Sequence, residues 1–441
     1  MHLSRSEKSK AEKKARKQRT GQVWIILNLC LIIMIAALLV YHFKFKEDPV
    51  QQTAYPPGMP EFGMEGEQEG NPGSRQPADG EGTDSMPPKT TETTETGEPP
   101  DSDMTEPEGS AADDPGDSAL AKRVVMHFAG DTLFSGKVED ALKNHGYDYP
   151  YKHLGTAFHE DDLTVLNLET PVTTGGVGAA NKKFVFKSSP DVLPALRDAG
   201  VEAVNLANNH ILDQGQEGLL DTLKHLKDHD IRYVGAGRNE KEAFAAQYFE
   251  LQGMTVALLG FSRVLPETTW YALENRPGVA GAYDHVLPKA VEAINAARSK
   301  ADLVVVVAHW GEELHKTPNV HQINLSRAFI DGGADLIIGG HPHVLQGLEQ
   351  YKGKWIAYST GNFIFTKSSN EDTWKTAVFQ ASCSKQGECD LKLTPYRTEI
   401  GQVIPLEGKE AEALLKEVEK RSVGGVKIAL DGKVIAGKAV E

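Results

Sequence analysis

Ala-Asp-Leu-Ile-Ile-Gly-Gly-His-Pro-His, residues 334–343, is the stretch of this 441-residue chain that decides its fold. The apolar run Leu336–Ile338 predicts a short buried strand, which two glycines end. His341 and His343 follow on either side of a proline, so both imidazoles can face one point. A buried strand that delivers two imidazoles at its carboxyl end indicates a metal site at the edge of an α/β sheet.

Four other apolar runs are followed in the same way by residues that bind metals. The runs are 124–129, 163–168, 203–207 and 303–308, and the residues after them are Asp131, Glu169, Asn209 with His210, and His309. Sites in open α/β sheets collect beyond the carboxyl ends of strands, so we expect these side chains to converge. Carboxylate, amide and imidazole groups suit a divalent ion such as Mn, Fe, Zn or Ca. The predicted metal ligands are Asp131, Glu169, Asn209, His309, His341 and His343.

Each of these motifs also has an ordinary structural explanation when it is taken alone. An aspartate after a strand is commonly a helix N-cap or a turn former, and a histidine at the mouth of a buried strand is commonly structural. Their coincidence at five strand ends favours a metal site. Asp213 stands close enough to His210 to orient its imidazole, so His210 and Asp213 are the predicted catalytic acid–base pair.

Four weaker candidates for substrate binding flank the motifs. They are Asn167, Asn208, Lys187 and Asn362. Asn362 lies in Tyr358–Phe363, which ends a strand with Gly and Asn, and ordinary turn chemistry explains that segment equally well. Lys187 forms a basic group with Lys182 and Lys183 beside two phenylalanines, for which the alternative is a solvated charged edge.

Strand-like and helix-like runs alternate from Lys122 onward, and this order favours an α/β core with two mixed sheets. We expect strands at 123–130, 162–169, 203–209, 231–235, 255–261, 303–310, 336–340, 355–359, 377–382 and 391–398. We expect helices at 136–144, 190–199, 216–229, 288–299, 320–331 and 409–421, and a small hairpin after Arg421. Cys383 and Cys389 flank a short polar turn, where an extracellular location permits a disulfide.

The residues before the folded part divide into segments of opposite charge. Residues 1–22 hold eight Lys or Arg against two acids, whereas residues 47–118 hold nineteen acids against two basic residues. The net charge of −15 is therefore mainly a property of the acidic segment and says little about ligands of the folded part. That segment has too few apolar residues to fold, so residues 44–121 are predicted to be a disordered linker, either an extended spacer or unconstrained filler.

Between these segments lies a nearly unbroken apolar stretch, Val23–Tyr41, whose nineteen residues approach the length that spans a bilayer. The basic residues precede it, so the positive-inside rule places the N-terminus in the cytoplasm and the rest of the chain outside. A cleaved signal peptide is the alternative, but no small-x-small site follows the stretch. The predicted organisation is a basic cytoplasmic segment at 1–22, a single-pass anchor at 23–43, the linker, a folded domain at 122–405, and a C-terminal appendage at 406–441.

The motifs together resemble the bacterial capsule-synthesis family of CapA and PgsA, a divergent branch of the calcineurin-like metallophosphoesterases. The resemblance spans about residues 123–365. It rests on GDTLFSG (130–136), LNLETPVT (166–173), FVFKSSP (184–190), LANNHILDQGQEGLLDTL (206–223), HWGEE (309–313), ADLIIGGHPHVLQGLE (334–349) and YSTGNFIF (358–365).

This resemblance implies a four-layer α/β/β/α sandwich with the site between the sheet edges. It places Glu169 at the bridging carboxylate, Asn209, His309 and His341 at one metal, Asp131 and His343 at the other, and His210 at the general acid. Leu133 stands where those phosphoesterases have a further histidine, and the bridging residue is Glu rather than Asp. These departures favour one tightly bound metal over two and put phosphoesterase activity in doubt.

Two classes of function follow from the residues and the resemblance. The first is an anchored accessory subunit that binds an anionic polymer such as poly-γ-glutamate and acts with other capsule synthase subunits in its synthesis or export. The second is an extracellular metal-dependent hydrolase acting on a phosphoester, or on an amide of the polymer or the cell wall. No nucleic-acid partner is expected, because the folded part is mildly acidic and lacks a recognised reading motif.

Overall fold

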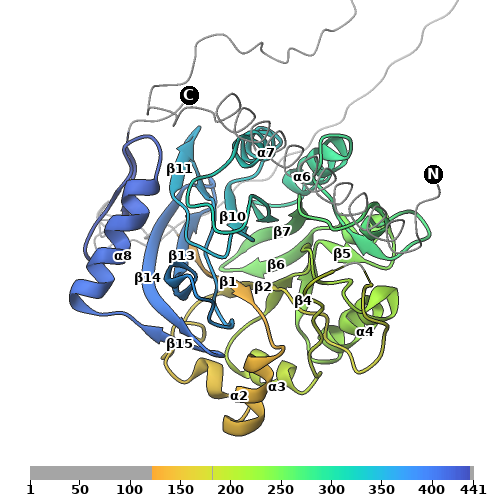
Figure 1. Cartoon of the computed structure of the whole chain (residues 1–441). Helices are drawn as coiled ribbons and strands as arrows, with labels where there is room; N and C mark the ends of the chain where they lie inside the picture. The colour runs from red at the N-terminus through yellow and green to blue at the C-terminus, as the bar shows by residue number, and fades with distance from the viewer. Residues whose placement is uncertain (1–121, 181, 438–441) are drawn as a thin grey trace, which may run out of the picture. The chain divides into compact units, whose positions relative to one another are not determined.

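Two mixed β-sheets pack face to face in this computed structural model, which describes residues 122–180 and 182–437 (Figure 1). The expected α/β fold is confirmed, and so is the expectation of two mixed sheets. The predicted anchor at 23–43 and the linker at 44–121 lie outside the described residues. Within the described residues, no helix is both long enough and apolar enough to cross a bilayer.

The first sheet has seven strands in the order β15-β14-β13-β1-β2-β3-β4. Its strands β1 to β4 are parallel, and β13, β14 and β15 continue the sheet by antiparallel pairing. Their bounds are β1 Arg123–Thr132, β2 Leu163–Leu168, β3 Ala203–Asn205, β4 Arg232–Val234, β13 Lys375–Ser384, β14 Cys389–Glu399 and β15 Gln402–Pro405.

The second sheet has six strands in the order β11-β12-β10-β9-β7-β6. Four of them are parallel, and the edge strands β6 and β11 run antiparallel to their neighbours. Their bounds are β6 Gln247–Leu251, β7 Met254–Ser262, β9 Leu303–His309, β10 Leu336–Gly340, β11 Leu348–Tyr351 and β12 Lys354–Ala357. A two-stranded ladder of β5 (Ala236–Gly237) and β8 (Gly278–Val279) stands apart from the two sheets.

Alternation along β9 explains why helices cover the outer face of each sheet. Leu303, Val305 and Val307 point into the core between the two sheets, whereas Val304 and Val306 point to the helices on the other face. Both sets are buried, so the strand reads as one continuous aliphatic run. Such a strand is stable only with apolar partners on both faces, which this layered arrangement supplies.

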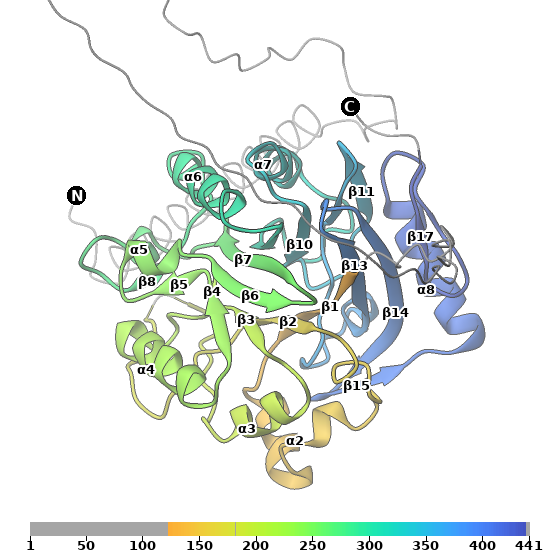
Figure 2. The same cartoon turned by 180° about the vertical axis from the view of Figure 1, so that it is seen from behind.

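Helices therefore lie outside both sheets, as the two opposite views show (Figures 1 and 2). The helices α6 and α7 pack on the second sheet, and α2, α3 and α4 pack on the first. The bounds are α2 Lys137–His145, α3 Val192–Asp198, α4 Gly215–Asp228, α5 Glu240–Ala243, α6 Leu287–Arg298, α7 Val320–Asp331 and α8 Gly408–Arg421, with 3₁₀ turns η1 Tyr149–Tyr151, η2 Thr268–Trp270 and η3 Glu371–Trp374.

The C-terminal residues close the open end of the core between the sheets. Leu414, Leu415 and Val418 on α8 belong to that core, and the hairpin of β16 (Lys427–Ile428) and β17 (Val434–Ile435) follows. The hairpin after Arg421 was expected from its turn residues and is confirmed. Cys383 and Cys389 face each other across β13 and β14 and are joined by a disulfide.

Candidate metal centre

The carboxyl ends of the two sheets meet, and the predicted ligands gather at their junction. From the first sheet, Asp131 lies at the end of β1, and Glu169 and Asn209 follow β2 and β3. From the second sheet, His309 ends β9, and His341 and His343 follow β10. Asp131, Glu169, His309 and His341 are buried, and Asn209 and His343 are partly buried. The parallel strand order thus brings together residues that lie up to two hundred positions apart.

Glycines let the backbones approach closely enough for this convergence. A Cβ atom on Gly130 would lie 1.9 Å from the carbonyl oxygen of Gly361, and one on Gly340 would lie 2.7 Å from Oδ1 of Asp131. His341 and His343 themselves have φ angles of 93° and 58°, which L-residues rarely adopt. Backbone strain of this kind is concentrated at functional sites, where the surrounding structure holds it in place.

One ligand group contains Glu169, His309 and His341, whose donor atoms lie within 4.8 Å of one another. Nε2 of His309 is 2.8 Å from Oδ1 of Asn209 and 3.5 Å from Oε1 of Glu169. Ligand atoms about 2.1 Å from one ion are separated by such distances, so Asn209 completes this group. Its mixture of one carboxylate, one amide and two imidazoles suits a borderline divalent ion.

The second ligand group contains Asp131, Glu169 and His343. Oδ2 of Asp131 is 3.2 Å from Nδ1 of His343, and Oε1 of Glu169 is 4.0 Å from Nε2 of the same ring. Glu169 therefore belongs to both groups and stands between them. Leu133, which follows Asp131 by two residues, is buried and offers no donor atom.

Unpaired polar atoms show that these residues fit a divalent cation. Both carboxylate oxygens of Glu169 and Nδ1 of His341 are buried without a hydrogen-bond partner. Such orphaned groups are costly in a folded protein unless they bind something. The donor set and the orphaned oxygens both fit a cation at this position.

The pKa values around Glu169 also fit a cation at this position. Burial, and next the Asp131 carboxylate, raise the pKa of Glu169 well above its usual range. Burial lowers the pKa of His341 to about 3 and holds the pKa of His309 well below its usual range, so both imidazoles are neutral and able to bind a metal. Burial also acts to lower the pKa of His343, but Glu169 and Asp131 outweigh it and raise that pKa to about 10.

Buried asparagine side chains, joined by hydrogen bonds, hold the ligands in position. Asn167 donates from Nδ2 to Oδ1 of Asp131 at 2.8 Å, and its own Oδ1 accepts from Asn205 at 3.0 Å and Asn208 at 3.3 Å. Asn208 also accepts, through Oδ1, from the backbone N–H groups of His210 and Ile211. Asn167 and Asn208 thus shape the ligand loops, and their predicted substrate contacts stay predictions. The sequence reasoning missed Asn205.

The predicted acid–base pair lies beside Asn209. Nδ1 of His210 is 2.7 Å from Oδ2 of Asp213, whose carboxylate is fully buried. Asp213 also accepts from the backbone N–H of Phe186 at 2.8 Å and from Nζ of Lys182 at 2.5 Å. Burial lowers the pKa of His210, an effect that Asp213 partly offsets. This is the geometry in which Asp213 orients His210, as the sequence predicted.

Aromatic rings flank this pair in a way that the sequence did not indicate. The ring of Phe186 lies 4.4 Å from the imidazole of His210, and Nζ of Lys182 lies 5.0 Å from the centre of the Trp270 ring. Trp270 lies in η2, far along the chain from Lys182, so the sequence spacing of these two residues does not indicate their contact. Of the lysines grouped in the sequence, Lys182 is largely buried here, whereas Lys183 and Lys187 are exposed.

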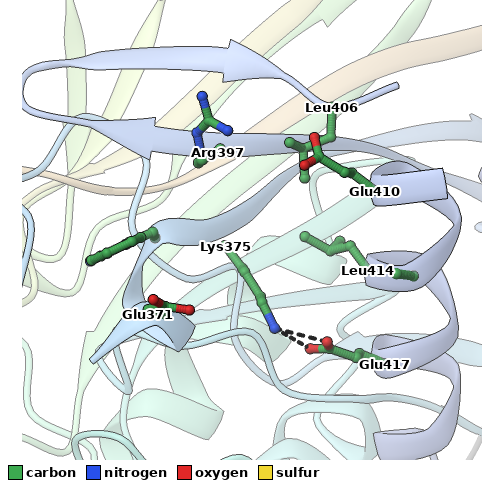
Figure 3. A pocket seen from close by; sticks show the side chains of 9 residues that line it. Glu371, Lys375, Arg397, Leu406, Glu410, Leu414 and Glu417 are labelled. Carbon is green, nitrogen blue, oxygen red and sulfur yellow. Dashed lines mark hydrogen bonds and ion pairs between the residues drawn. The ribbon is translucent and has the colours of Figure 1, made fainter. Parts of the chain in front are cut away.

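A separate pocket of about 320 Å³ lies between α8, β14 and η3, away from the predicted site residues (Figure 3). Its apolar wall is formed by Leu406, Ala413 and Leu414. Lys375 at its edge is paired with Glu417 at 2.8 Å, as the dashed lines show. The Lys375 charge is thus paired within the wall, and none of the predicted ligands lines this pocket.

Comparisons with known proteins match this chain to capsule-synthesis proteins. The profile described as "Bacterial capsule synthesis protein PGA_cap" matches residues 125–367. "Capsule biosynthesis protein CapA" of Bacillus anthracis is 34% identical over 289 residues, which cover 65% of this chain and 70% of that protein. "PGA biosynthesis protein CapA" of Bacillus subtilis (strain 168) is 32% identical over 311 residues, which cover 70% of this chain and 80% of that protein.

Among solved structures, a 5'-nucleotidase from Candida albicans SC5314 aligns at 12% identity with a TM-score of 0.34, over 62% of this chain and 52% of its own. A similarity this low leaves the classification to the sequence matches. The matched residues include all six predicted ligands and both members of the acid–base pair. The chain therefore belongs to the bacterial capsule synthesis protein family.

Proposed function

We propose that this protein is a membrane-anchored, extracellular subunit that serves the synthesis or export of an anionic capsule polymer such as poly-γ-glutamate. The relatives named above are capsule and PGA biosynthesis proteins, and they support this role. The family match at residues 125–367 includes the complete ligand cluster, and the cluster therefore takes part in the proposed role. Other capsule synthase subunits are the proposed protein partners.

The observation that carries the metal part of the proposal is Glu169, whose two buried oxygens lack a hydrogen-bond partner between two ligand groups. Asn209, His309 and His341 would hold one divalent ion with Glu169, and Asp131 and His343 a second, as in the metallophosphoesterases that the motifs resemble. A bound ion supplies positive charge for carboxylate or phosphate groups and can activate water. Asn167 keeps Asp131 in place and also contacts Nδ1 of His309, the ring nitrogen that faces away from Asn209.

The extracellular location is supported by the disulfide between Cys383 and Cys389, since disulfides persist mainly in oxidising compartments. The apolar stretch Val23–Tyr41, with the basic residues before it, is the proposed single-pass anchor, which leaves the N-terminus in the cytoplasm. Cysteine-reactive labelling of intact cells tests this topology. A cysteine placed in the linker should react with a membrane-impermeant reagent, and one placed before Val23 should not.

Complementation tests the role in capsule synthesis. A strain that lacks this gene should recover secreted polymer when it receives the wild-type chain, and should fail to do so with His341→Ala. The variant must first be shown to accumulate in the membrane at the wild-type level. Full polymer output from a stable His341→Ala protein would show that the ligand cluster is not needed for the proposed role. An unchanged amount of secreted polymer in the deletion strain would contradict the proposed role in capsule synthesis.

A metal-dependent hydrolase is the second candidate function, and the His210–Asp213 pair is the observation that favours it. His210 follows the ligand Asn209 directly, and its Nδ1 is held by Asp213 at 2.7 Å. An imidazole oriented in this way can donate a proton to a leaving group beside a metal. The candidate substrates are a phosphoester, or an amide of the polymer or the cell wall. Turnover of such substrates by wild-type protein, lost in His210→Ala, distinguishes this function from a binding role.

A further inference from the structure

Asn362 touches the metal centre from a segment outside the ligand-bearing strands. Its backbone runs beside the end of β1, where the N–H of Asp131 donates to Gly361 at 2.9 Å and the N–H of Phe363 donates to Asp131 at 2.8 Å. Thr398 donates from Oγ1 to the carbonyl oxygen of Asn362 at 2.8 Å. Asn362 is 2% exposed, so its amide side chain has no access to competing water. The position of Asn362 relative to Asp131 is therefore fixed.

Two contacts determine which way the Asn362 amide points. Its Nδ2 lies 3.2 Å from the carbonyl oxygen of Thr373, and its Oδ1 lies 2.9 Å from Nδ1 of His343. The reverse orientation would set Oδ1 against the Thr373 carbonyl, which is also an acceptor. Oδ1 therefore faces His343, and Nδ1 of His343 must carry the hydrogen.

This hydrogen bond decides which nitrogen of His343 can bind a metal. With the hydrogen on Nδ1, Nε2 is the nitrogen left to bind an ion, and it lies 4.0 Å from Oε1 of Glu169. Two ligand atoms on one ion, each at about 2.1 Å, can be separated by that distance. Asp131 is the second acceptor near Nδ1, at 3.2 Å, but its Oδ2 already accepts from the backbone of His341 at 3.1 Å. Of the two acceptors near Nδ1 of His343, Asn362 is the nearer one, and it carries no charge.

We propose that Asn362 is a positioning residue, which fixes the ring and tautomer of His343 and so sets the affinity of the Asp131–Glu169–His343 group for its ion. This inference rests on the proposed metal site. Outer partners of metal-bound histidines change metal affinity by about 10- to 100-fold when they are removed. The backbone of His343 has a φ of 58°, and the contact with Asn362 restrains its ring.

The test compares Asn362→Leu with Asn362→Asp in the full-length protein. Both variants remove the donor to Thr373, but only Asp keeps an acceptor for His343. Competition with a chromophoric chelator measures the number of bound Zn²⁺ ions and their affinities, and His343→Ala and His341→Ala assign the two groups. We expect Asn362→Leu to weaken the His343 group by about 10- to 100-fold and to leave the His341 group within about twofold, while Asn362→Asp retains both.

Thr398→Val is the matched control, because Thr398 holds the backbone of Asn362 and does not touch His343. It should lower thermal stability without changing either affinity. A second readout is the nitrogen spectrum of ¹⁵N-histidine-labelled, zinc-loaded protein, in which His343 should carry its proton on Nδ1 and the metal on Nε2. Metal on Nδ1 would overturn the proposal.

The remaining outcomes separate this inference from the function on which it rests. A wild-type protein that binds no ion contradicts the proposed metal site and the inference with it. A wild type that binds only the ion of the His341 group contradicts the inference and the second ion, and leaves the His341 group and its proposed role standing. Equal affinities in wild type and Asn362→Leu, or equal losses in the Leu and Asp variants, also overturn it, because they leave Asn362 with a purely structural role.

Discussion

Oε1 of Glu169 lies 3.5 Å from Nε2 of His309, yet neither oxygen of this buried carboxylate accepts a hydrogen bond. A carboxylate in that condition is stable when a cation compensates it, and otherwise it tends to hold a proton. Burial and the neighbouring Asp131 carboxylate raise the pKa of Glu169, and the proximity of Glu169 and His309 allows one ion to contact both. The predictions below follow from this relationship and from the groups around it.

The first prediction concerns metal content. Elemental analysis of the wild-type chain, purified without a histidine tag, should find about one or two divalent ions, and Glu169→Ala and His341→Ala should lose them. An ion at one hundred times its Kd should add about 2.7 kcal/mol to the free energy of unfolding. His127→Ala is the control, because His127 is a buried histidine that is paired with Asp161 at 2.9 Å and belongs to neither ligand group. A wild type that takes up no Mn²⁺, Zn²⁺ or Ca²⁺ contradicts the prediction.

Metal binding should release protons, so the affinity should rise with pH. Burial raises the pKa of Glu169, and the Glu169 and Asp131 carboxylates raise the pKa of His343 to about 10, so this coupled cluster holds at least one proton at neutral pH without an ion. His341, whose pKa burial lowers to about 3, is already neutral and releases none. Calorimetry in buffers of different ionisation enthalpy should find at least one proton released per ion, and about tenfold tighter binding per pH unit for each proton. Glu169→Gln should release fewer protons, and pH-independent binding would refute this account.

His210 should matter for chemistry but not for metal content. If the protein is a hydrolase, His210→Ala should reduce turnover by about 10²- to 10⁴-fold, because the leaving group loses its proton donor. The ions should remain, since the ligands are untouched. Turnover of phosphoester and poly-γ-glutamate substrates and elemental analysis measure the two effects, with exposed His153→Ala as the control. Unchanged polymer output and stability in His210→Ala would instead favour the binding role.

Lys182 and Asp213 should be energetically coupled. Lys182→Met leaves the buried Asp213 carboxylate with two donors instead of three, and should lower the free energy of unfolding by up to about 3 kcal/mol. The Lys182 side chain is 13% exposed, so solvent screening keeps the loss below that of a fully buried pair. Urea unfolding of Lys182→Met, Asp213→Asn and the double variant measures the coupling. Losses that add within about 0.5 kcal/mol would show that the two groups act independently.

The disulfide should stabilise the first sheet without affecting the metal centre. Cys383 and Cys389 are six residues apart, and a loop of that size corresponds to about 2 kcal/mol of chain entropy. The paired alanine variant and the reduced wild type should lose about that much stability in urea unfolding. Cys383 pairs with Val124, at the opposite end of β1 from Asp131, so the number of bound ions should not change. A loss of ions on reduction contradicts this separation.

The sequence predicts the buried strands well because burial on both faces leaves an uninterrupted apolar run. The strand 336–340 and the helix 320–331 have the bounds that their patterns indicated. The edge strands β6 and β11 were missed because polar residues such as Gln247 and Gln350 interrupt their apolar pattern. The predicted strand 203–209 ends at Asn205, whose side chain accepts from the N–H of Ala207 and turns the chain out of the sheet.

The candidate site was predictable where its residues follow strands and unpredictable where they come from loops. Asp131, Glu169 and His309 converge because parallel strands share one carboxyl edge. Lys182 and Trp270 reach the His210 loop from connections whose paths depend on tertiary contacts, so no spacing indicates them. The orientation of Asn362 depends on Thr373, eleven residues away in η3, and is likewise a property of the fold.

The ligand groups draw on both sheets, and this division gives a bound ion a mechanical role. Asp131 and Glu169 belong to the first sheet, and His309, His341 and His343 to the second, so an ion shared by them is a cross-link between the two halves of the sandwich. Under tension such a cross-link makes the halves separate only after the ion is lost. With the extracellular location proposed above, the supply of divalent ions would govern how much pulling force the folded part withstands.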